Sequence, residues 1–259
     1  MSDAPMSQRI VVLGASNVSR GLGRLVRAIE SRAPAADLFV AAGHGRSYGA
    51  NSRVWVRRLP SILRCGLWQA IDRDDSPARP LHAFVSDIGN DLLYGFSVDQ
   101  TAAWVRESVR RLAERDARIV ITRLPLASLT GVGEVRYWLL RSCFVPGCQL
   151  SLAAVKAAAI SLDEAVVEIA AQYRATVIDQ PGSWYGLDAI HVRRRHLDML
   201  WERAGDAWGL LPERVPPGSL VRWAQVGSRA AEVRSIAGAM CYTPQPVLRL
   251  SGGGRVSLY

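Results

Sequence analysis

The chain has 259 residues, enough for one large domain or for one domain with an appendage. It is 49% hydrophobic and 21% charged, it holds no apolar run of membrane-spanning length, and its first residues lack the features of a secretory signal. We therefore expect a soluble cytoplasmic protein without a membrane span, and its net charge of +9 raises the question of an anionic partner.

Short apolar runs alternate with segments that have helical spacing along most of the chain. Predicted strands cover residues 9–14, 37–42, 82–87, 118–122 and 175–179. Predicted helices cover residues 21–28, 53–63, 98–114, 152–173 and 194–208. Five buried strands that alternate with helices predict an α/β protein, with a parallel sheet and helices on both faces.

The connections differ in character. Residues 43–49 form a glycine-rich loop, and residues 72–80 form a polar connection. Residues 124–149 have no clear period and contain aromatic side chains, so we expect an irregular insertion that covers the substrate.

Prolines near residue 212 mark a change of character. We expect a catalytic domain over residues 1–210 and a C-terminal extension over residues 211–259. The extension has a predicted short helix and a hairpin over residues 246–259, and it is compatible with packing on the core, an oligomer contact or a frayed tail.

Polar residues with the types needed for acyl transfer follow four of the five predicted strands. Ser16 follows the first strand, Gly45 the second, Asn90 the third, and Asp188 and His191 the fifth. In a doubly wound sheet these loops share one edge. The sequence therefore predicts that the groups needed for acyl transfer lie close together at this edge. They are a serine nucleophile, a histidine base with a carboxylate to orient it, and neutral donors for an oxyanion.

Each residue also has a simpler structural interpretation. Ser16 alone would be read as a helix N-cap, and Ser19 is the expected cap if Ser16 is the nucleophile. Asn90 suits the end of a strand, and Asp91 is predicted to cap the next segment. A lone His191 would be structural, but a carboxylate three residues earlier favours catalysis.

These segments together resemble the SGNH hydrolases, also called the GDSL esterase and lipase family. The four blocks of that family correspond here to Gly14-Ala-Ser16, to Gly45, to Gly89-Asn-Asp91 and to Asp188-Ala-Ile-His191. The resemblance covers about residues 9–208, in the family's order. The aspartate that usually precedes the serine is an alanine here, and Gly43 is an alternative to Gly45 for the second block.

The resemblance implies a flavodoxin-like three-layer α/β/α sandwich with a five-stranded parallel sheet. It implies metal-free ester hydrolysis by Ser16, Asp188 and His191, without a cofactor. The oxyanion hole would comprise the backbone N–H groups of Ser16 and Gly45 and the side chain of Asn90, and the expected acyl group is acetyl or another short chain. His44 and Arg46 are predicted to line the pocket, and a small-molecule or glycan ester is the expected substrate.

Two rival functions use the same residues. An acyltransferase would replace water with an alcohol or amine acceptor, and a catalytically idle domain would serve as a binding module. Nucleic acid is not the expected partner, because the arginines are spread along the chain with few aromatic residues among them. The run of residues 193–195 either holds an acidic substrate group or forms a solvated helix face.

Cofactor and metal motifs are missing from the sequence. The glycine loop has the wrong spacing for a dinucleotide site, and the single lysine, Lys156, does not follow a glycine as a phosphate-binding loop requires. The four cysteines match no zinc pattern and are predicted to be free thiols.

Overall fold

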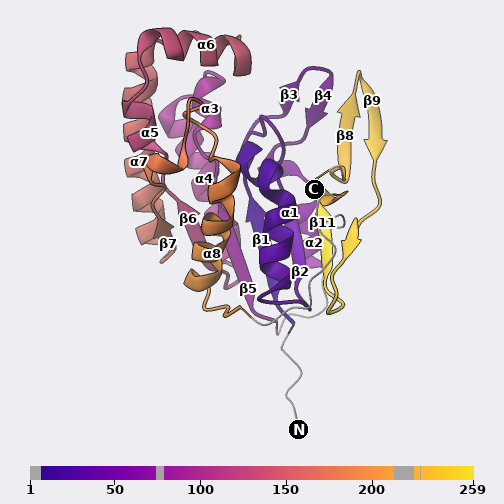
Figure 1. Ribbon diagram of the computed structural model, residues 1–259. Coiled ribbons are helices and arrows are strands. Elements are labelled where there is room, and N and C mark those ends of the chain that lie inside the picture. Colours follow the sequence, from indigo (N-terminus) through magenta and orange to yellow (C-terminus); the bar gives the residue numbers. More distant parts are fainter. Residues whose placement is uncertain (1–6, 74–78, 213–224, 228) are drawn as a thin grey trace.

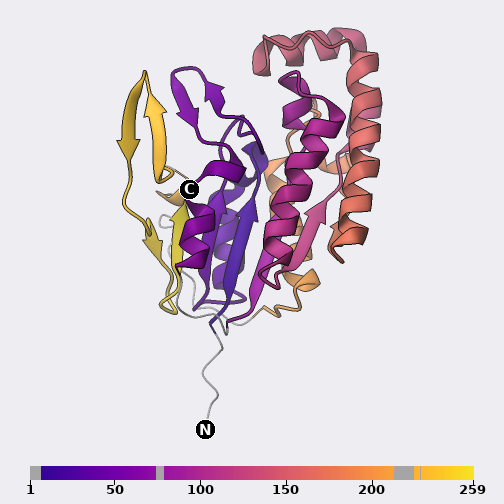
Figure 2. The same cartoon turned by 180° about the vertical axis from the view of Figure 1, so that it is seen from behind.

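The computed structural model describes residues 7–73, 79–212, 225–227 and 229–259. The start of the chain, most of the polar connection over residues 72–80 and most of the short helix predicted after residue 212 lie outside these residues. The described part is a three-layer α/β/α sandwich, as predicted (Figures 1 and 2).

The five predicted core strands are present and parallel. In the order of the sheet they are β2 (Asp37–Ala41), β1 (Arg9–Leu13), β5 (Leu81–Val85), β6 (Arg118–Thr122) and β7 (Thr176–Ile178). In chain order this arrangement reads 2-1-3-4-5, the flavodoxin-like order.

The predicted count of five strands is wrong, because the sheet has seven. The hairpin expected near the end of the chain exists as β10 (Leu248–Arg249) and β11 (Arg255–Leu258). Strand β11 pairs in parallel with β2, at the edge that the five core strands leave open. A pairing across more than 200 residues has no local signal in the sequence. The boundary predicted at residue 210 stays a prediction.

Both faces of the sheet are covered by helices. Helices α1 (Ser16–Glu30) and α8 (Leu197–Ala207) pack on one face, together with Ile10 and Val12 of β1. The other face holds Val11 and Leu13 together with α2 (Leu67–Asp72), α4 (Val98–Ala113) and α7 (Leu152–Gln172). Successive strand residues point to opposite faces, so one apolar run supplies both cores.

The helix predicted over residues 53–63 is wrong. This segment forms the hairpin of β3 (Ser52–Val54) and β4 (Arg57–Leu59), followed by a single 3-10 turn over Ile62–Arg64. The valines and Trp55 favour extended backbone, and Trp55 makes the turn with a φ of 57°. Strand β4 pairs with β8 (Val233–Ile236), which pairs with β9 (Ala239–Tyr242), giving a second, antiparallel sheet that was not predicted.

The insertion over residues 124–149 is helical rather than irregular. It contains α5 (Leu126–Thr130) and α6 (Glu134–Phe144). Only Tyr137 of α6 is buried, whereas Val135, Trp138 and Phe144 are exposed. A helix with apolar side chains on several sides has no single apolar stripe, and therefore no helical period is visible in this part of the sequence.

The remaining short elements lie close to the carboxyl ends of the strands. They are α3 (Asn90–Leu93) and the 3-10 turns Gly182–Trp184 and Arg194–His196. The last of these turns and α8 together occupy the segment predicted as one helix over residues 194–208.

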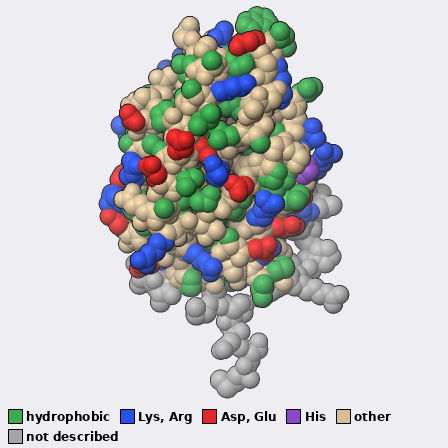
Figure 3. Space-filling model, turned by 90° about the vertical axis from the view of Figure 1, so that its left-hand side faces the viewer, with side chains coloured by type: hydrophobic (Ala, Val, Ile, Leu, Met, Phe, Trp, Pro, Cys, Tyr) green, Lys and Arg blue, Asp and Glu red, His purple; other side chains and the backbone are tan. Residues whose placement is uncertain are grey.

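Among the described residues, no helix is both long and apolar enough to cross a membrane. All four cysteines are free, as predicted. Figure 3 views the side that carries α7 and shows acidic and basic side chains interspersed over that face.

Candidate active site

The predicted site residues lie at the edge of the sheet where the parallel strands end. The turn after β1 is flanked on both sides by neighbouring strands. The N–H of Gly14 donates to the carbonyl of Ala41 at the end of β2 (3.1 Å), and the N–H of Ser86 after β5 donates to the carbonyl of Leu13 (3.0 Å). The loops that leave β2 and β5 therefore begin on either side of Ser16.

Ser16, His191 and Asp188 form one hydrogen-bonded chain. The Nε2 atom of His191 lies 2.9 Å from Oγ of Ser16, and its Nδ1 atom is hydrogen-bonded to Oδ2 of Asp188. With the Nδ1 proton held by Asp188, Nε2 is the acceptor that faces the serine hydroxyl. Ser16 is 8% exposed, so the hydroxyl lies at the floor of a recess rather than on the surface.

The carboxylate of Asp188 is held in its charged form. Burial alone would raise its pKa, but hydrogen bonds from the His191 ring and from the N–H groups of Ile190 and His191 outweigh burial, so that the pKa of Asp188 falls below its ordinary value. The two backbone donors also fix the carboxylate in the plane that the imidazole needs.

Asp87 caps helix α1 from the neighbouring strand end. It has a φ of 59°, and its Oδ2 atom accepts the N–H groups of Ala15 (2.7 Å) and Asn17 (3.0 Å), with Val18 at 3.4 Å. Among the described residues no hydrogen bond uses the N–H of Ser16, which therefore stays available at the positive end of the helix.

Asn17 ties the serine turn to the histidine loop. Its Nδ2 atom donates to Asp87 (2.7 Å) and to the carbonyl of Ile190 (3.1 Å), and its Oδ1 atom accepts the N–H of Val192 (2.9 Å). The residues on both sides of His191 are thus bonded to the residue that follows Ser16. The distance between nucleophile and base consequently depends on one buried amide.

The two remaining oxyanion candidates flank Ser16. Gly45 has a φ of 66°, and a Cβ there would lie 2.6 Å from Val54, so the position requires glycine. Gly43 is also confined, since a Cβ would overlap Leu59, but it is buried whereas Gly45 is partly exposed. Among the described residues no hydrogen bond uses the N–H of Gly45 or the amide of Asn90.

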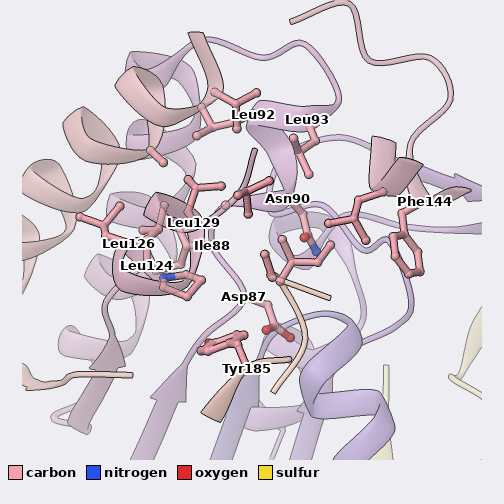
Figure 4. A pocket seen from close by; sticks show the side chains of 18 of the residues that line it. Asp87, Ile88, Asn90, Leu92, Leu93, Leu124, Leu126, Leu129, Phe144 and Tyr185 are labelled. Atoms are coloured by element: carbon pink, nitrogen blue, oxygen red, sulfur yellow. The ribbon is translucent and has the colours of Figure 1, made fainter. Parts of the chain in front are cut away.

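A largely apolar cavity of about 1070 Å³, part of it open to solvent, lies at the end of β5 beside Asp87 and Asn90 (Figure 4). Asn90, Asp87 and Tyr185 border it near the catalytic residues, and Phe144 packs its edge against the His191 ring with 5.4 Å between ring centroids. Its walls are mostly leucines from α3, α5, α6 and the end of β6: Leu92, Leu93, Leu124, Leu126, Leu129 and Leu140. The insertion therefore borders the pocket, and the expectation that it covers a substrate stays a prediction.

His44 and Arg46 were both predicted to line the pocket, but neither lines the apolar cavity. His44 is exposed and lines a second cavity, on the β2 side. Burial is the largest cause that lowers its pKa, followed by the charges of Arg57, His191 and Arg20. Arg46 is fully buried and donates to the carbonyls of Ala42, Pro60 and Tyr259, so it ties β11 to the loop after β2 instead of facing substrate.

Two capping predictions are wrong. Ser19 lies inside α1, and the helix is capped by Asp87 because the carboxylate reaches its first turn from β5. Asp91 is fully buried and accepts the N–H of Tyr48 (3.0 Å) rather than a helix N–H. Burial raises the pKa of Asp91 to about 6.

Asp87 and Asn17 belong to the site but were not predicted from the sequence. Asp87 appears only as the end of a strand, and its role depends on a positive φ that an aspartate tolerates better than most residues. The position of Asn17 directly after Ser16 was the one sequence feature that could have indicated its role. Among the described residues, no cluster of three or more His, Cys, Asp or Glu could hold a metal ion.

Comparison with known proteins is informative at the level of structure. Neither a family model nor a curated protein matches the sequence. An inhibitor-bound aryl esterase from M. smegmatis aligns with 79% of this chain and 100% of its own, at 13% identity and a TM-score of 0.51. A carbohydrate acetylesterase family member from Sinorhizobium meliloti aligns with 78% of this chain and 100% of its own, also at 13% identity and a TM-score of 0.51.

At sequence identities this low, the structural similarity is evidence for a shared fold only. The aligned share includes most of the three-layer core, and the four sequence blocks meet at one edge of its sheet. The chain therefore has the fold of the SGNH hydrolases.

Proposed function

We propose that the protein is a serine hydrolase that cleaves a carboxylic ester through an acyl-enzyme on Ser16. The observation that carries the proposal is the hydrogen-bonded chain from Ser16 through His191 to Asp188 beside a cavity. The esterases among the structures of the same fold support the choice of an ester.

The chemistry follows from the positions of the donors and acceptors. Oγ of Ser16 attacks the ester carbonyl while Nε2 of His191 takes its proton, and the oxyanion accepts the N–H groups of Ser16 and Gly45 and the amide of Asn90. The bond to the alcohol oxygen breaks as His191 returns the proton to it. Water then attacks the acyl carbonyl, His191 takes and returns a proton again, and the carboxylic acid leaves.

The acyl group is proposed to enter the apolar cavity. An acetyl group, the sequence-based expectation, would contact few of the leucines that line the cavity, whereas an alkyl chain would be removed from water along its length. We therefore propose that the enzyme accepts acyl chains longer than acetyl. A series of p-nitrophenyl esters of increasing chain length tests this, with kcat/KM rising beyond the acetyl ester.

Labelling with a fluorophosphonate, read by intact mass, tests the nucleophile. Wild type and Ser19→Ala should each gain one adduct, Ser16→Ala none, and His191→Gln should react far more slowly. An adduct that persists in Ser16→Ala would refute the assignment, and no adduct on folded wild type would count against the proposed function. Asn90→Ala should lower kcat by about 10²–10³-fold, the usual effect of losing one oxyanion donor.

A further inference from the structure

A second cavity of about 850 Å³, part of it open to solvent, lies at the end of β2, whereas the apolar cavity lies at the end of β5, on the other side of β1. The loop after β5 leads to the apolar cavity, and the loop after β2 leads to this one, since Val40, Gly43 and His44 line it. Its outer wall comes from β4 and the segment before β8, which belong to the antiparallel sheet. Ser19, one turn of α1 beyond Ser16, also lines it.

The two cavities differ in charge. The second cavity is lined by Arg57, Arg229 and Arg234, and no aspartate or glutamate occurs among its described lining residues. Nη2 of Arg57 donates to the carbonyl of His44 (3.1 Å), and Nη1 of Arg234 donates to Oγ1 of Thr243 (2.6 Å). These acceptors are neutral, and none of the three arginines forms an ion pair with a residue that the structure describes.

Nearby groups add to the positive charge. Burial and the charge of Arg234 lower the pKa of Arg57, as expected for two guanidinium groups that line the same cavity. Arg20, four residues after Ser16 on α1, has a buried Nη1 atom that no described residue hydrogen-bonds. Its charge helps to lower the pKa of His44, whereas the charge of Asp87 raises it. Assembled guanidinium groups without acids are characteristic of sites that bind phosphate.

We propose that this second cavity binds a phosphate group carried by the ester substrate, while the apolar cavity holds the acyl chain. The inference rests on the proposed function and deepens it: the substrate is an amphiphilic ester with an apolar acyl part and a phosphorylated alcohol. The guanidinium groups act on binding, so they select among substrates by KM. Ser16 follows β1, and β1 lies between β2 and β5, at whose ends the two cavities begin.

A matched pair of substrates tests the proposal: hexanoyl glycerol and hexanoyl glycerol 3-phosphate, compared at constant ionic strength. The wild type should prefer the phosphorylated ester by about tenfold or more in kcat/KM, mainly through KM. The preference should fall toward one in Arg57→Gln and in Arg229→Gln. Arg229 is exposed, so its variant keeps the test open if Arg57→Gln does not fold.

Arg58→Gln is the matched control. Arg58 follows Arg57 on β4, is exposed and points to the other face of the sheet, so this variant should keep the preference of the wild type. Inorganic phosphate should inhibit hydrolysis of the neutral ester competitively, and its inhibition constant should rise about tenfold in Arg229→Gln but not in Arg58→Gln.

The outcomes separate the two proposals. If wild type hydrolyses the neutral ester without preferring the phosphorylated one, the phosphate site is refuted and the proposed function stands. An equal loss of preference in Arg58→Gln would show a general charge effect and would also refute the site. If neither ester is hydrolysed and the fluorophosphonate adduct is absent, the proposed function itself fails.

Discussion

Replacing Asn17 with alanine should weaken the contact between Ser16 and His191 without changing either residue. The variant loses three hydrogen bonds and leaves the N–H of Val192 and the carbonyl of Ile190 without the amide that now satisfies them. At about 1 kcal/mol for each bond, the free energy of unfolding should fall by about 3 kcal/mol. For a chain of this size, that loss lowers Tm by about 6–12 °C.

The catalytic effect should exceed what a loss of stability alone would produce. With its tether to the loop around His191 removed, the imidazole samples positions away from Ser16, and kcat should fall by about 10–10²-fold with little change in KM. The assay is steady-state hydrolysis of a p-nitrophenyl ester well below the Tm of the variant, together with the rate of fluorophosphonate labelling. Both should fall in parallel, because both need the activated serine.

Two further variants sharpen this test. Asn17→Asp keeps an acceptor for Val192 but places a second oxygen against Asp87 and a carbonyl, so it should be at least as impaired as Asn17→Ala. Asn51→Ala, at an exposed asparagine, should match the wild type. If Asn17→Ala were folded and its kcat lay within about twofold of the wild-type value, the proposed tether would have no role in catalysis.

Three other predictions follow from the same geometry. Gly45→Ala should lower kcat by about 10²-fold, because its Cβ would lie 2.6 Å from Val54, whereas Gly95→Ala, with a similar positive φ and open space, should change stability more than kcat. Burial raises the pKa of Asp91 to about 6 in the folded protein, so its contribution to the free energy of unfolding should be greatest below about pH 4. That contribution should fall by up to about 3 kcal/mol as pH rises from 4 through 6. Urea unfolding at several pH values should show this loss for the wild type and not for Asp91→Asn. Adding glycerol to an esterase assay should leave acid as the main product, and a dominant transfer product would instead identify an acyltransferase.

The core of the fold could be predicted because buried parallel strands carry their own signal. Residues 9–13 are apolar at nearly every position, and both faces of such a strand are covered. The hairpin of β3 and β4 gives no such signal, since each of its strands is only three residues long and contains arginines. Its pairing partner, β8, lies about 180 residues further along the chain, and this contact decides the structure.

The candidate site was predictable for a different reason. Ser16, Asn90 and His191 have side chains with distinctive chemistry, and each follows a recognisable strand. Asp87 and Asn17 support these residues through backbone groups, and such contacts depend on a positive φ and on a loop that arrives from the far end of the chain. Residue type can indicate a reactive group, but it does not indicate which neighbour holds that group in position.

The segments that border the two cavities are the ones expected to determine which ester is bound. The two loops that carry the proposed oxyanion donors, after β2 and after β5, also line the two cavities. The outer wall of one cavity comes from α5 and α6, and the outer wall of the other comes from β4 and the segment before β8. The secondary structure of α5, α6 and β4 was predicted wrongly from the sequence. The reacting groups could therefore be found from sequence because every ester needs them in the same arrangement. The walls are free to differ between enzymes that share this fold, and variants in α6 or β4 should change which ester is chosen before they change how it is cleaved.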